Sequence, residues 1–516
     1  MTAHEKVLIF DLGSQYTQLI ARRIRELKVF CEIVRHDLPA AEVARQAPKG
    51  IVLSGGPASV YEHQSPRVDP AIFELGIPVL GICYGLQLMA EATGGKVGAA
   101  QAREYGHTRV TVDPESPLFR GLPRETVVWN SHGDLVTGLD AAHFRSIATT
   151  GSTPFAAVAH ASRPLYGVQF HPEVVHSKHG REVLANFVRG IAGCAGDWTM
   201  GSFVDEAVAT VRAQVGERGR VVCGLSGGVD SAVVALLLDR ALGERLTCIF
   251  VDNGLLRLGE AEEVEAAFRP RLGDRLRVVH AGERFLGQLA GVVDPEVKRK
   301  RIGHEFVAVF KDAALDIPDA HFLAQGTLYP DVIESRSAFG GPSATIKTHH
   351  NVGGLPAELG FELIEPLRQL FKDEVRRLGK ELELEQHLID RQPFPGPGLA
   401  VRVLGEVTPA RLDLVRQADA IVREELKRDP IHPTIWQAFA VLLPVQSVGV
   451  MGDARTYEAT CVVRVVESQD GMTADWVRVP HEVLATISSR ITNEVRGINR
   501  VVYDVTSKPP GTIEWE

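Results

Sequence analysis

Short apolar runs alternate with longer amphipathic segments in the first part of the chain. "KVLIF" at 6–10 is followed by a segment, 14–28, whose apolar residues recur at helical spacing. "GIVLSGG" at 50–56, "IPVLGIC" at 77–83 and "LYGVQFHPE" at 165–173 are further apolar runs that end in a turn. Buried parallel strands linked by helices give this pattern. It therefore predicts an α/β domain that closes with a helix at 180–193.

The same alternation restarts after "CAGDWTMGSF" at 194–203, which we interpret as a boundary. "GRVVCGL" at 219–225 predicts a strand, and the apolar segment from Asp230 to Leu242 predicts a helix. Further strands are expected at 246–252, 277–281 and 321–326. The Gly-rich segment 338–355 is compatible with a mobile lid or with a plain surface loop, and the sequence leaves both open.

A second boundary is predicted at "RQPFPGPGLAVRV", 391–403, because prolines and glycines cluster there. A charged helix at 409–428, alternating strands and an apolar tail at 508–516 follow. We expect three domains, at 1–195, 203–391 and 392–516. The fold class is α/β: two consecutive doubly wound parallel-sheet domains, then a small α+β domain.

Composition excludes several classes of protein. The 516 residues carry a net charge of -9, which argues against a nucleic-acid partner. The one basic cluster, "KRKR" at 298–301, is interpreted first as a solvated helix face. Neither a signal peptide nor a membrane-spanning run is predicted, so we expect a cytoplasmic protein that does not bind membranes.

One cysteine differs from the rest in its setting. Cys83 lies between an apolar strand and an apolar helix, flanked by Gly81 and Gly85. Such an elbow exposes a nucleophile and directs the following amides and the positive end of the helix toward it. No two cysteines form a CxxC pair, so the sequence does not suggest a cysteine metal site. The other cysteines are expected to be buried and structural: Cys31, Cys194, Cys223, Cys248 and Cys461.

A base for this thiol is offered by "FHPE". His171 and Glu173 are two apart on a strand, so they share a face and Glu173 can orient the imidazole. Amides near Gly55 and Gly56, together with that of Tyr84, are candidates for an oxyanion hole.

"GICYGLQ", "SGGP" and "FHPE" resemble the class I glutamine amidotransferases over roughly residues 6–191. The resemblance implies that Cys83 attacks the side-chain amide of glutamine, while His171 moves the proton and Glu173 orients it. It also implies that Gln87 and His132 bind glutamine.

A phosphate-binding loop without a lysine is predicted at "GLSGGVDSA", 224–232, which fails the Walker pattern. Its small residues let backbone amides approach an oxyanion at the N-terminus of the helix. Such a loop suits a leaving pyrophosphate, so attack would fall on the α-phosphorus. Asp230 is a candidate Mg²⁺ ligand, or an acid that merely favours the helix start.

"SGGVDS" resembles the PP-loop of the N-type ATP pyrophosphatases, and "FVDNGLLR" resembles their nucleotide-binding segment. The implied ATP-binding residues are Ser226, Gly227, Gly228, Val229, Asp230, Ser231, Ala232, Val251 and Asp252.

The two halves together resemble the glutamine-hydrolysing GMP synthases, nearly end to end, through stretches such as "GTLYPDVIES" and "KPPGTIEWE". The resemblance implies a ligase that uses Mg²⁺ with ATP, and no tightly bound organic cofactor. XMP is adenylylated on its 2-oxygen, pyrophosphate leaves, and ammonia from glutamine displaces AMP to give GMP. A homodimer formed through residues 392–516 is also implied.

Four residues are implied at the XMP site or the lid: Arg299, Lys347, Lys508 and Glu514. Lys347 could equally be an exposed loop lysine, and the adjacent His349 and His350 lack the spacing of a metal site. Alternative functions are a glutamine-dependent NAD synthetase, which generally has a different cysteine context, and a non-catalytic regulatory protein. A CTP-synthase-type enzyme would need a Walker loop.

Overall fold

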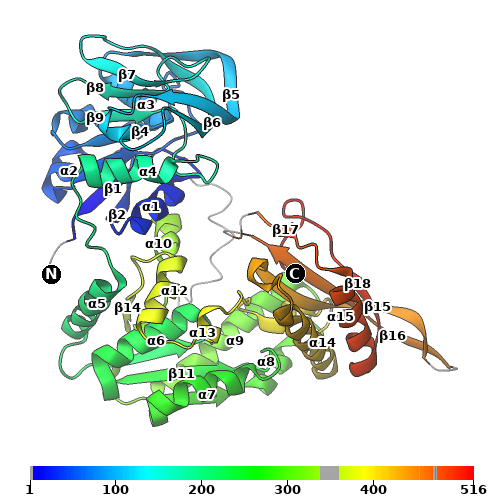
Figure 1. Cartoon of the computed structure of the whole chain (residues 1–516). Coiled ribbons are helices and arrows are strands. Elements are labelled where there is room, and N and C mark those ends of the chain that lie inside the picture. The colour runs from blue at the N-terminus through cyan, green and yellow to red at the C-terminus, as the bar shows by residue number, and fades with distance from the viewer. Residues whose placement is uncertain (1–3, 337–359, 452–453, 469–470, 472) are drawn as a thin grey trace. The chain divides into compact units, whose positions relative to one another are not determined.

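The computed structural model describes residues 4–336, 360–451, 454–468, 471 and 473–516. The chain divides into two compact units, Met1–Phe203 and Val204–Glu516 (Figure 1). The predicted loop at 338–355, with Lys347, His349 and His350, lies outside the described residues.

The first unit is built on one sheet with the strand order β2-β1-β3-β4-β9-β8-β7-β5-β6. Its parallel part is β1 (Lys6–Asp11), β2 (Phe30–Arg35), β3 (Gly50–Leu53), β4 (Val79–Ile82) and β9 (Leu165–Val168). The helices are α1 (Thr17–Glu26), α2 (Ala40–Gln46), α3 (Tyr84–Ala92) and α4 (Gly180–Ala185). The predicted α/β pattern is confirmed for this part, because the strands carry continuous buried apolar runs.

An antiparallel half, which the sequence patterns did not predict, extends this sheet. It consists of β5 (Lys96–Val112), β6 (Glu125–Gly138), β7 (Phe144–Thr149) and β8 (Ala157–His160). The long β5–β6 hairpin lies in a polar stretch where apolar alternation is weak. The amide of His171, in the segment after β9, donates to the Trp129 carbonyl on β6 at 2.9 Å, which places β6 beside the end of the parallel part.

The second unit begins with an all-parallel sheet in the order β12-β11-β10-β13-β14. These strands are β10 (Arg220–Leu225), β11 (Leu246–Asp252), β12 (Leu276–His280), β13 (Ala320–Ala324) and β14 (Glu362–Ile364). The helices are α5 (Met200–Val215), α6 (Val229–Leu242), α7 (Glu260–Leu272), α8 (Gly282–Leu289), α9 (Pro295–Leu315), α10 (Tyr329–Arg336), α12 (Lys372–Glu381) and α13 (Gln386–Ile389). The strand order reverses at β10, between β11 and β13. Ligands of open α/β sheets bind at the carboxyl ends of the strands at such a point.

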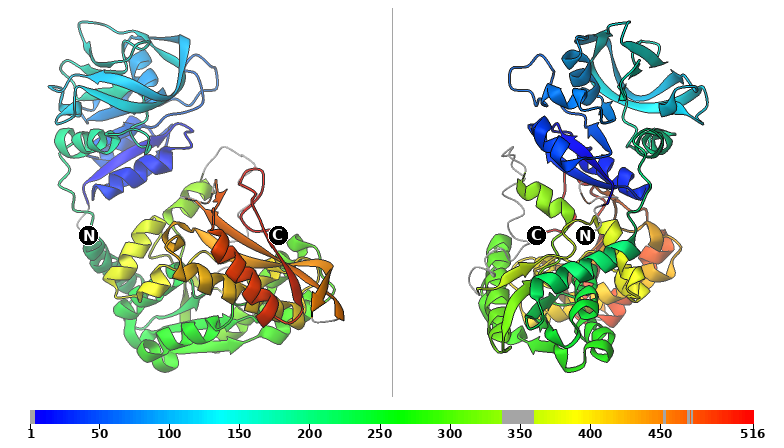
Figure 2. Two further views of the ribbon diagram at one scale, coloured as in Figure 1. Left: turned by 45° about the vertical axis from the view of Figure 1, so that its right-hand side comes forward. Right: turned by 90° about the vertical axis from the view of Figure 1, so that its left-hand side faces the viewer.

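The rest of the second unit is an α+β segment. It comprises α14 (Pro409–Arg428), β15 (Gln437–Met451), β16 (Ala454–Glu467), β17 (Asp475–Trp476), α15 (His481–Glu494) and β18 (Ile498–Tyr503). β15 and β16 pair as a long antiparallel ribbon, and β18 runs parallel to β16 (Figure 2).

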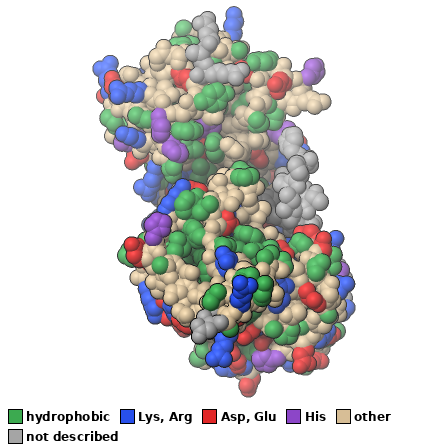
Figure 3. All heavy atoms as spheres, turned by 90° about the vertical axis from the view of Figure 1, so that its right-hand side faces the viewer, with side chains coloured by type: hydrophobic (Ala, Val, Ile, Leu, Met, Phe, Trp, Pro, Cys, Tyr) green, Lys and Arg blue, Asp and Glu red, His purple; other side chains and the backbone are tan. Residues whose placement is uncertain are grey.

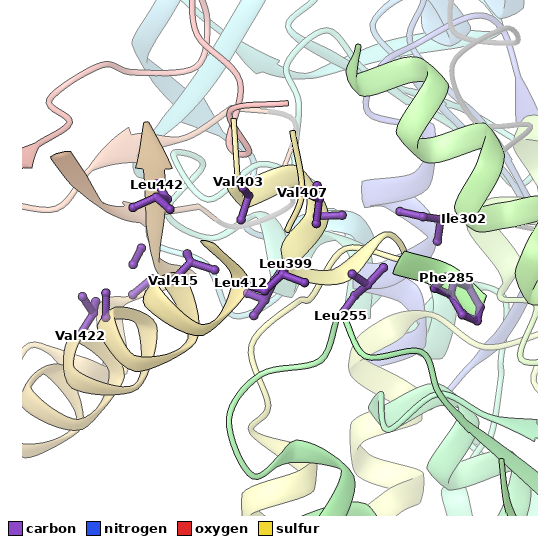
Figure 4. Close-up of a cluster of buried hydrophobic side chains, with 14 of the residues drawn as sticks. Leu255, Phe285, Ile302, Leu399, Val403, Val407, Leu412, Val415, Val422 and Leu442 are labelled. Atoms are coloured by element: carbon purple, nitrogen blue, oxygen red, sulfur yellow. The ribbon is translucent and has the colours of Figure 1, made fainter. Parts of the chain in front are cut away.

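One buried cluster joins the two parts of the second unit. Phe285 and Ile302, from α8 and α9, belong to the same core as Val415 and Leu442, from α14 and β15 (Figure 4). The boundary after residue 391 stays a prediction, because the compact unit continues across it. Among the helices of the described part, none has the length and apolar character needed to cross a membrane.

Candidate active sites

The thiol of the first unit sits on a strained turn between β4 and α3. Cys83 has φ +51° and ψ -105°, a backbone conformation that L-residues rarely adopt. Its amide donates to the carbonyl of Val168 on β9, 2.8 Å away. Gly85 is required beside it, since an added Cβ there would lie 2.4 Å from the carbonyl oxygen of Leu53. The predicted elbow is therefore present.

His171 and Glu173 form a buried pair next to this thiol. Nδ1 of His171 lies 2.7 Å from Oε1 of Glu173. The amide of His171 donates to the Trp129 carbonyl on β6 at 2.9 Å, and the Ser177 hydroxyl donates to the His171 carbonyl at 2.6 Å. Two hydrogen bonds thus fix the backbone of the base, and its carboxylate partner fixes the ring.

Gly55 lies where the histidine and the cysteine meet. A Cβ on Gly55 would be 3.2 Å from Cε1 of His171 and 3.8 Å from Cβ of Cys83. The triad residues predicted from the sequence therefore lie together around one glycine, and the lack of a side chain keeps the space next to the sulfur open.

The imidazole of His171 strongly favours its protonated form. Burial acts to lower its pKa, but the Glu173 carboxylate and the contact with Cys83 outweigh burial and raise the pKa to about 11. Burial dominates at His132, whose pKa is lowered despite the nearby Glu104 carboxylate. The pKa values of the two buried histidines of this site are thus shifted in opposite directions.

The predicted oxyanion-hole residues lie side by side. A Cβ on Gly56 would be 3.3 Å from Cδ1 of Tyr84 and 2.5 Å from the Leu12 carbonyl oxygen. Tyr84 is the first residue of α3, and the first amides of a helix have no intrahelical acceptor. This arrangement can present amide N–H groups to an anion beside the sulfur.

Gln87 and His132, the residues implied in glutamine binding, are both buried. Nε2 of Gln87 donates to the Asp134 carbonyl at 2.9 Å, which ties α3 to β6. Nε2 of His132 lies 3.5 Å from Oε2 of Glu104, which is its register partner on β5. The sequence analysis missed Glu104, because only the β5–β6 pairing brings it here.

The loop after β10 has the form of a phosphate cradle. Gly227 has φ +75°, and the hydroxyls of Ser226 and Ser231 lie 2.9 Å apart across the loop. The amide of Gly228 donates to the Ser226 hydroxyl at 3.3 Å. Arg391 donates from Nη1 to the Gly227 carbonyl at 2.6 Å, so a distant cation braces the outside of the turn.

Asp230, in the first turn of α6, uses its two carboxylate oxygens differently. Oδ2 lies 2.5 Å from Nζ of Lys372 on α12, whereas buried Oδ1 has no hydrogen-bond partner among the described residues. The sequence analysis missed Lys372, which lies far from the loop in sequence. Asp252 is the last residue of β11 and accepts the amide of Gly254 at 3.0 Å, and the preceding Val251 is buried.

The tail is docked, as its apolar residues predicted, but its acids are already paired. Glu514 accepts from Arg402 in a two-point contact of 3.0 and 3.2 Å, and from Gln437 at 2.7 Å. Nζ of Lys508 donates to the Gly471 carbonyl at 2.8 Å. Arg299 donates to the backbone carbonyl of Glu516.

The interpretation of "KRKR" as a solvated helix face is wrong for Lys298, whose side chain is fully buried. Its Nζ donates to the Val403 carbonyl at 2.8 Å and to Oε2 of Glu516 at 2.5 Å. The helical pattern failed here because carbonyls from the segment after residue 398 turn toward α9 and solvate the ammonium group.

Known protein families match the chain in the same order as these sites. The model described as Glutamine amidotransferase class-I matches residues 8–191, that of NAD synthase matches 203–258, and that of GMP synthase C terminal domain matches 424–515. The chain is 57% identical to the GMP synthase [glutamine-hydrolyzing] of Caldanaerobacter subterraneus over 512 residues, 99% of each protein. It is 58% identical to that of Phenylobacterium zucineum over 516 residues, 99% of each, and 56% identical to that of Streptomyces coelicolor over 524 residues, 100% of this chain and 98% of the relative.

Proposed function

The chain belongs to the family of glutamine-hydrolysing GMP synthases, and on that premise we propose that it aminates XMP to GMP with glutamine as the nitrogen donor. One observation supports this most directly. The His171–Glu173 pair lies beside the strained Cys83 in a chain that also carries a phosphate loop without a lysine of its own. The first arrangement releases ammonia, and the second prepares an acceptor for it.

In the glutaminase step, the sulfur of Cys83 attacks the side-chain amide carbon of glutamine. His171 already holds the proton taken from the thiol and passes it to the departing ammonia, while Glu173 keeps Nδ1 occupied and the ring oriented. Amides of Gly56 and Tyr84 stabilise the oxyanion. Water then cleaves the thioester, which frees glutamate and restores the thiol.

In the synthetase step, residues 226–232 hold the phosphates of ATP at the N-terminus of α6. The 2-oxygen of XMP attacks the α-phosphorus, the bond to the β-phosphate breaks, and pyrophosphate leaves. Ammonia then adds to carbon 2 of the adenylylated purine, and AMP departs with the oxygen. Val251 and Asp252 are proposed to contact the nucleoside part of ATP, because they are the last two residues of β11, at the edge of the sheet where that strand ends.

Mg²⁺ is proposed to accompany ATP, and the residues present are compatible with it. The free Oδ1 of Asp230 is a carboxylate oxygen without a hydrogen bond among the described residues. The described part of the chain holds no cluster of three or more His, Cys, Asp or Glu that could bind a metal, so phosphate oxygens and water would complete the shell. The bound ion would neutralise charge on the triphosphate. The proposal requires no tightly bound organic cofactor.

The XMP site is proposed to involve Arg299, Lys508 and Glu514, with Lys347 acting from the segment outside the described residues. A lysine or arginine can pair with the monophosphate, and a glutamate can accept from ring N–H groups. The contacts of Glu514 with Arg402 support this placement, because they hold its carboxylate in a fixed position before any ligand binds.

We further propose a homodimer formed through the β15–β16 ribbon, and a cytoplasmic location. Val448, Val450 and Tyr457 are exposed on this ribbon, and Val448 is the register partner of Tyr457, so the three share one face. Figure 3 shows hydrophobic side chains, with basic ones among them, on this side of the second unit. A second copy of the chain would cover this face. The six free cysteines fit a reducing compartment.

The experiment is to incubate the whole protein with Mg²⁺, ATP, glutamine and XMP, and to follow ultraviolet absorbance as XMP becomes GMP. Stoichiometric AMP and pyrophosphate are expected. Accumulation of ADP and orthophosphate, or turnover with deamido-NAD in place of XMP, would refute the proposal. Cys83→Ala should abolish glutamine-dependent synthesis and leave ammonia-dependent synthesis intact.

A further inference from the structure

A second side chain, besides His171, reaches the sulfur of the glutaminase site. Gln169 follows directly after β9, and its side chain is buried. Its Nε2 donates a hydrogen bond to Sγ of Cys83 over 3.6 Å, a normal length for a sulfur acceptor. Nothing in the sequence patterns singled out this residue, although it lies within the "QFHPE" segment.

The position of Gln169 is set by the backbone on both sides of the contact. Its amide donates to the Ala156 carbonyl at 2.8 Å, and the carbonyl of the preceding Val168 accepts the amide of Cys83 at 2.8 Å. Val168 is also the register partner of Ile82, the residue before the cysteine. The donor and the sulfur therefore leave adjacent ends of two paired strands, β9 and β4, and cannot drift apart without breaking the sheet.

A glutamine at this place is less favourable for stability than an apolar side chain of similar volume would be. Oε1 of Gln169 is buried and has no hydrogen-bond partner in the described part of the chain. An unsatisfied buried carbonyl is destabilising, and an apolar side chain of similar volume would avoid that cost. The amide is thus explained better by its contact with the thiol than by packing.

We propose that Gln169 is a further catalytic residue of the glutaminase, which donates a hydrogen bond to the anionic sulfur of Cys83. The inference rests on the proposed function and deepens it at the same site. A hydrogen bond to an ion is stronger than one to a neutral group, so the amide stabilises the thiolate more than the thiol.

The contact matters when the sulfur is a leaving group. In thioester hydrolysis, water adds to the carbonyl carbon and gives its proton to His171. The carbon–sulfur bond then breaks, and its electron pair goes to Sγ. At that moment the sulfur carries a full charge, and the amide of Gln169 stabilises this charge until the proton returns from His171.

The test uses the full chain and two variants of this residue. Gln169→Met keeps the volume and removes the donor, and Gln169→Glu replaces the amide with a carboxylate of the same shape. Glutamine-dependent kcat and KM are measured in the presence of Mg²⁺, ATP and XMP, and the rate of Cys83 alkylation by iodoacetamide is measured against pH. Ammonia-dependent synthesis reports on the second unit in the same preparations.

We expect kcat with glutamine to fall about 10- to 100-fold in Gln169→Met, with little change in KM, because a hydrogen bond to an ionised sulfur is lost. In Gln169→Glu the fall should be larger, and the pH of half-maximal alkylation should move upward, since a like charge disfavours the thiolate. Ammonia-dependent synthesis should stay unchanged in both.

Ser116→Ala is a matched control, because it removes a buried hydroxyl that has no partner among the described residues and leaves the thiol untouched. Wild-type kcat and an unshifted alkylation profile in Gln169→Met would overturn the inference, as would a rise in KM alone, which would make Gln169 a glutamine-binding residue. A failure of the wild-type protein itself to consume glutamine would refute the proposed function instead.

Discussion

The Glu173 carboxylate can be tested alone by Glu173→Gln, which keeps the shape of the side chain. In the wild-type protein this carboxylate is fully buried, and it lies 2.7 Å from Nδ1 of His171. The amide that replaces it can still form a hydrogen bond, but it carries no charge. The substitution therefore removes the electrostatic part of the contact and leaves the packing in place.

The expected loss follows from the nature of this contact. Hydrogen bonds between charged groups contribute about 1.5–3 kcal/mol, and the upper part of that range applies to a pair as buried as this one. At 1.36 kcal/mol for each factor of ten, about 3 kcal/mol corresponds to a fall of roughly 100-fold in kcat with glutamine. Ammonia-dependent synthesis should not change, because the triad serves only the first unit.

The pH dependence should change in a defined direction. Glu173 and Cys83 raise the pKa of His171 to about 11 against the effect of burial, so the imidazolium persists until the pH approaches that value. Without the carboxylate, only the contact with Cys83 opposes burial, so the pKa of His171 falls below its wild-type value. The alkaline limb of kcat/KM should therefore move to lower pH.

The unfolding free energy provides an independent test of the same change in the pKa of His171. A raised folded-state pKa stabilises the fold fully below the unfolded-state pKa, 6.5, and this contribution declines as pH rises toward about 11. The difference in unfolding free energy between wild type and variant should thus be largest below pH 6.5 and should shrink above it.

The assay is steady-state glutamine turnover at a series of pH values, with thermal unfolding measured in the same buffers. Glu182→Gln is the matched control, since Glu182 is an exposed acid on α4 in the same unit. An alkaline limb that stays in place in Glu173→Gln, or a kcat within a few-fold of wild type, would show that the carboxylate does not hold the proton on His171.

Three further predictions concern the second unit. Asp230→Ala should abolish GMP synthesis from both glutamine and ammonia, which the absorbance assay measures, because it removes the acid with a free carboxylate oxygen at the phosphate loop; retained activity with either donor would contradict this role. Glu516→Gln should lower the unfolding free energy by about 3 kcal/mol in denaturant titrations, because it leaves the buried ammonium of Lys298 without its counter-charge; a stability equal to wild type would mean that the carbonyls alone suffice. Val450→Asp should convert the proposed dimer into monomers, as measured by light scattering, with folding retained; an unchanged mass would exclude the ribbon as the interface.

The sequence predicted those parts of the sites that lie close together along the chain. Cys83 with its glycines forms one turn, as its spacing predicted. His171 and Glu173 do pair, but the prediction that both lie on a strand is wrong, because β9 ends at Val168 and the two residues follow it in a turn segment. The Ser226–Asp230 loop was predicted from its spacing, as the Cys83 turn was. Apolar runs likewise predicted the parallel strands, since burial on both faces leaves a continuous apolar signal.

Residues brought in by pairing between distant segments were missed. Glu104 reaches His132 only through the β5–β6 hairpin, whose strands are too polar to give a clear period. Gln169 contacts the sulfur of Cys83 because β9 pairs with β4, although the two strands are far apart in the sequence. Neither contact can be predicted from the local pattern of apolar and polar residues. This pattern indicates which face of an element is buried, but not which residues pack against that face.

The phosphate loop illustrates the same limit most clearly. The segment 224–232 contains no lysine, so the sequence analysis described the loop as lacking one. In the fold, however, α12 places Nζ of Lys372 2.5 Å from Asp230, at the start of the helix that follows the loop. A cation therefore stands beside the loop, supplied from a different part of the chain. The charged groups around a phosphate site therefore have to be identified from three-dimensional contacts and not from the sequence motif alone.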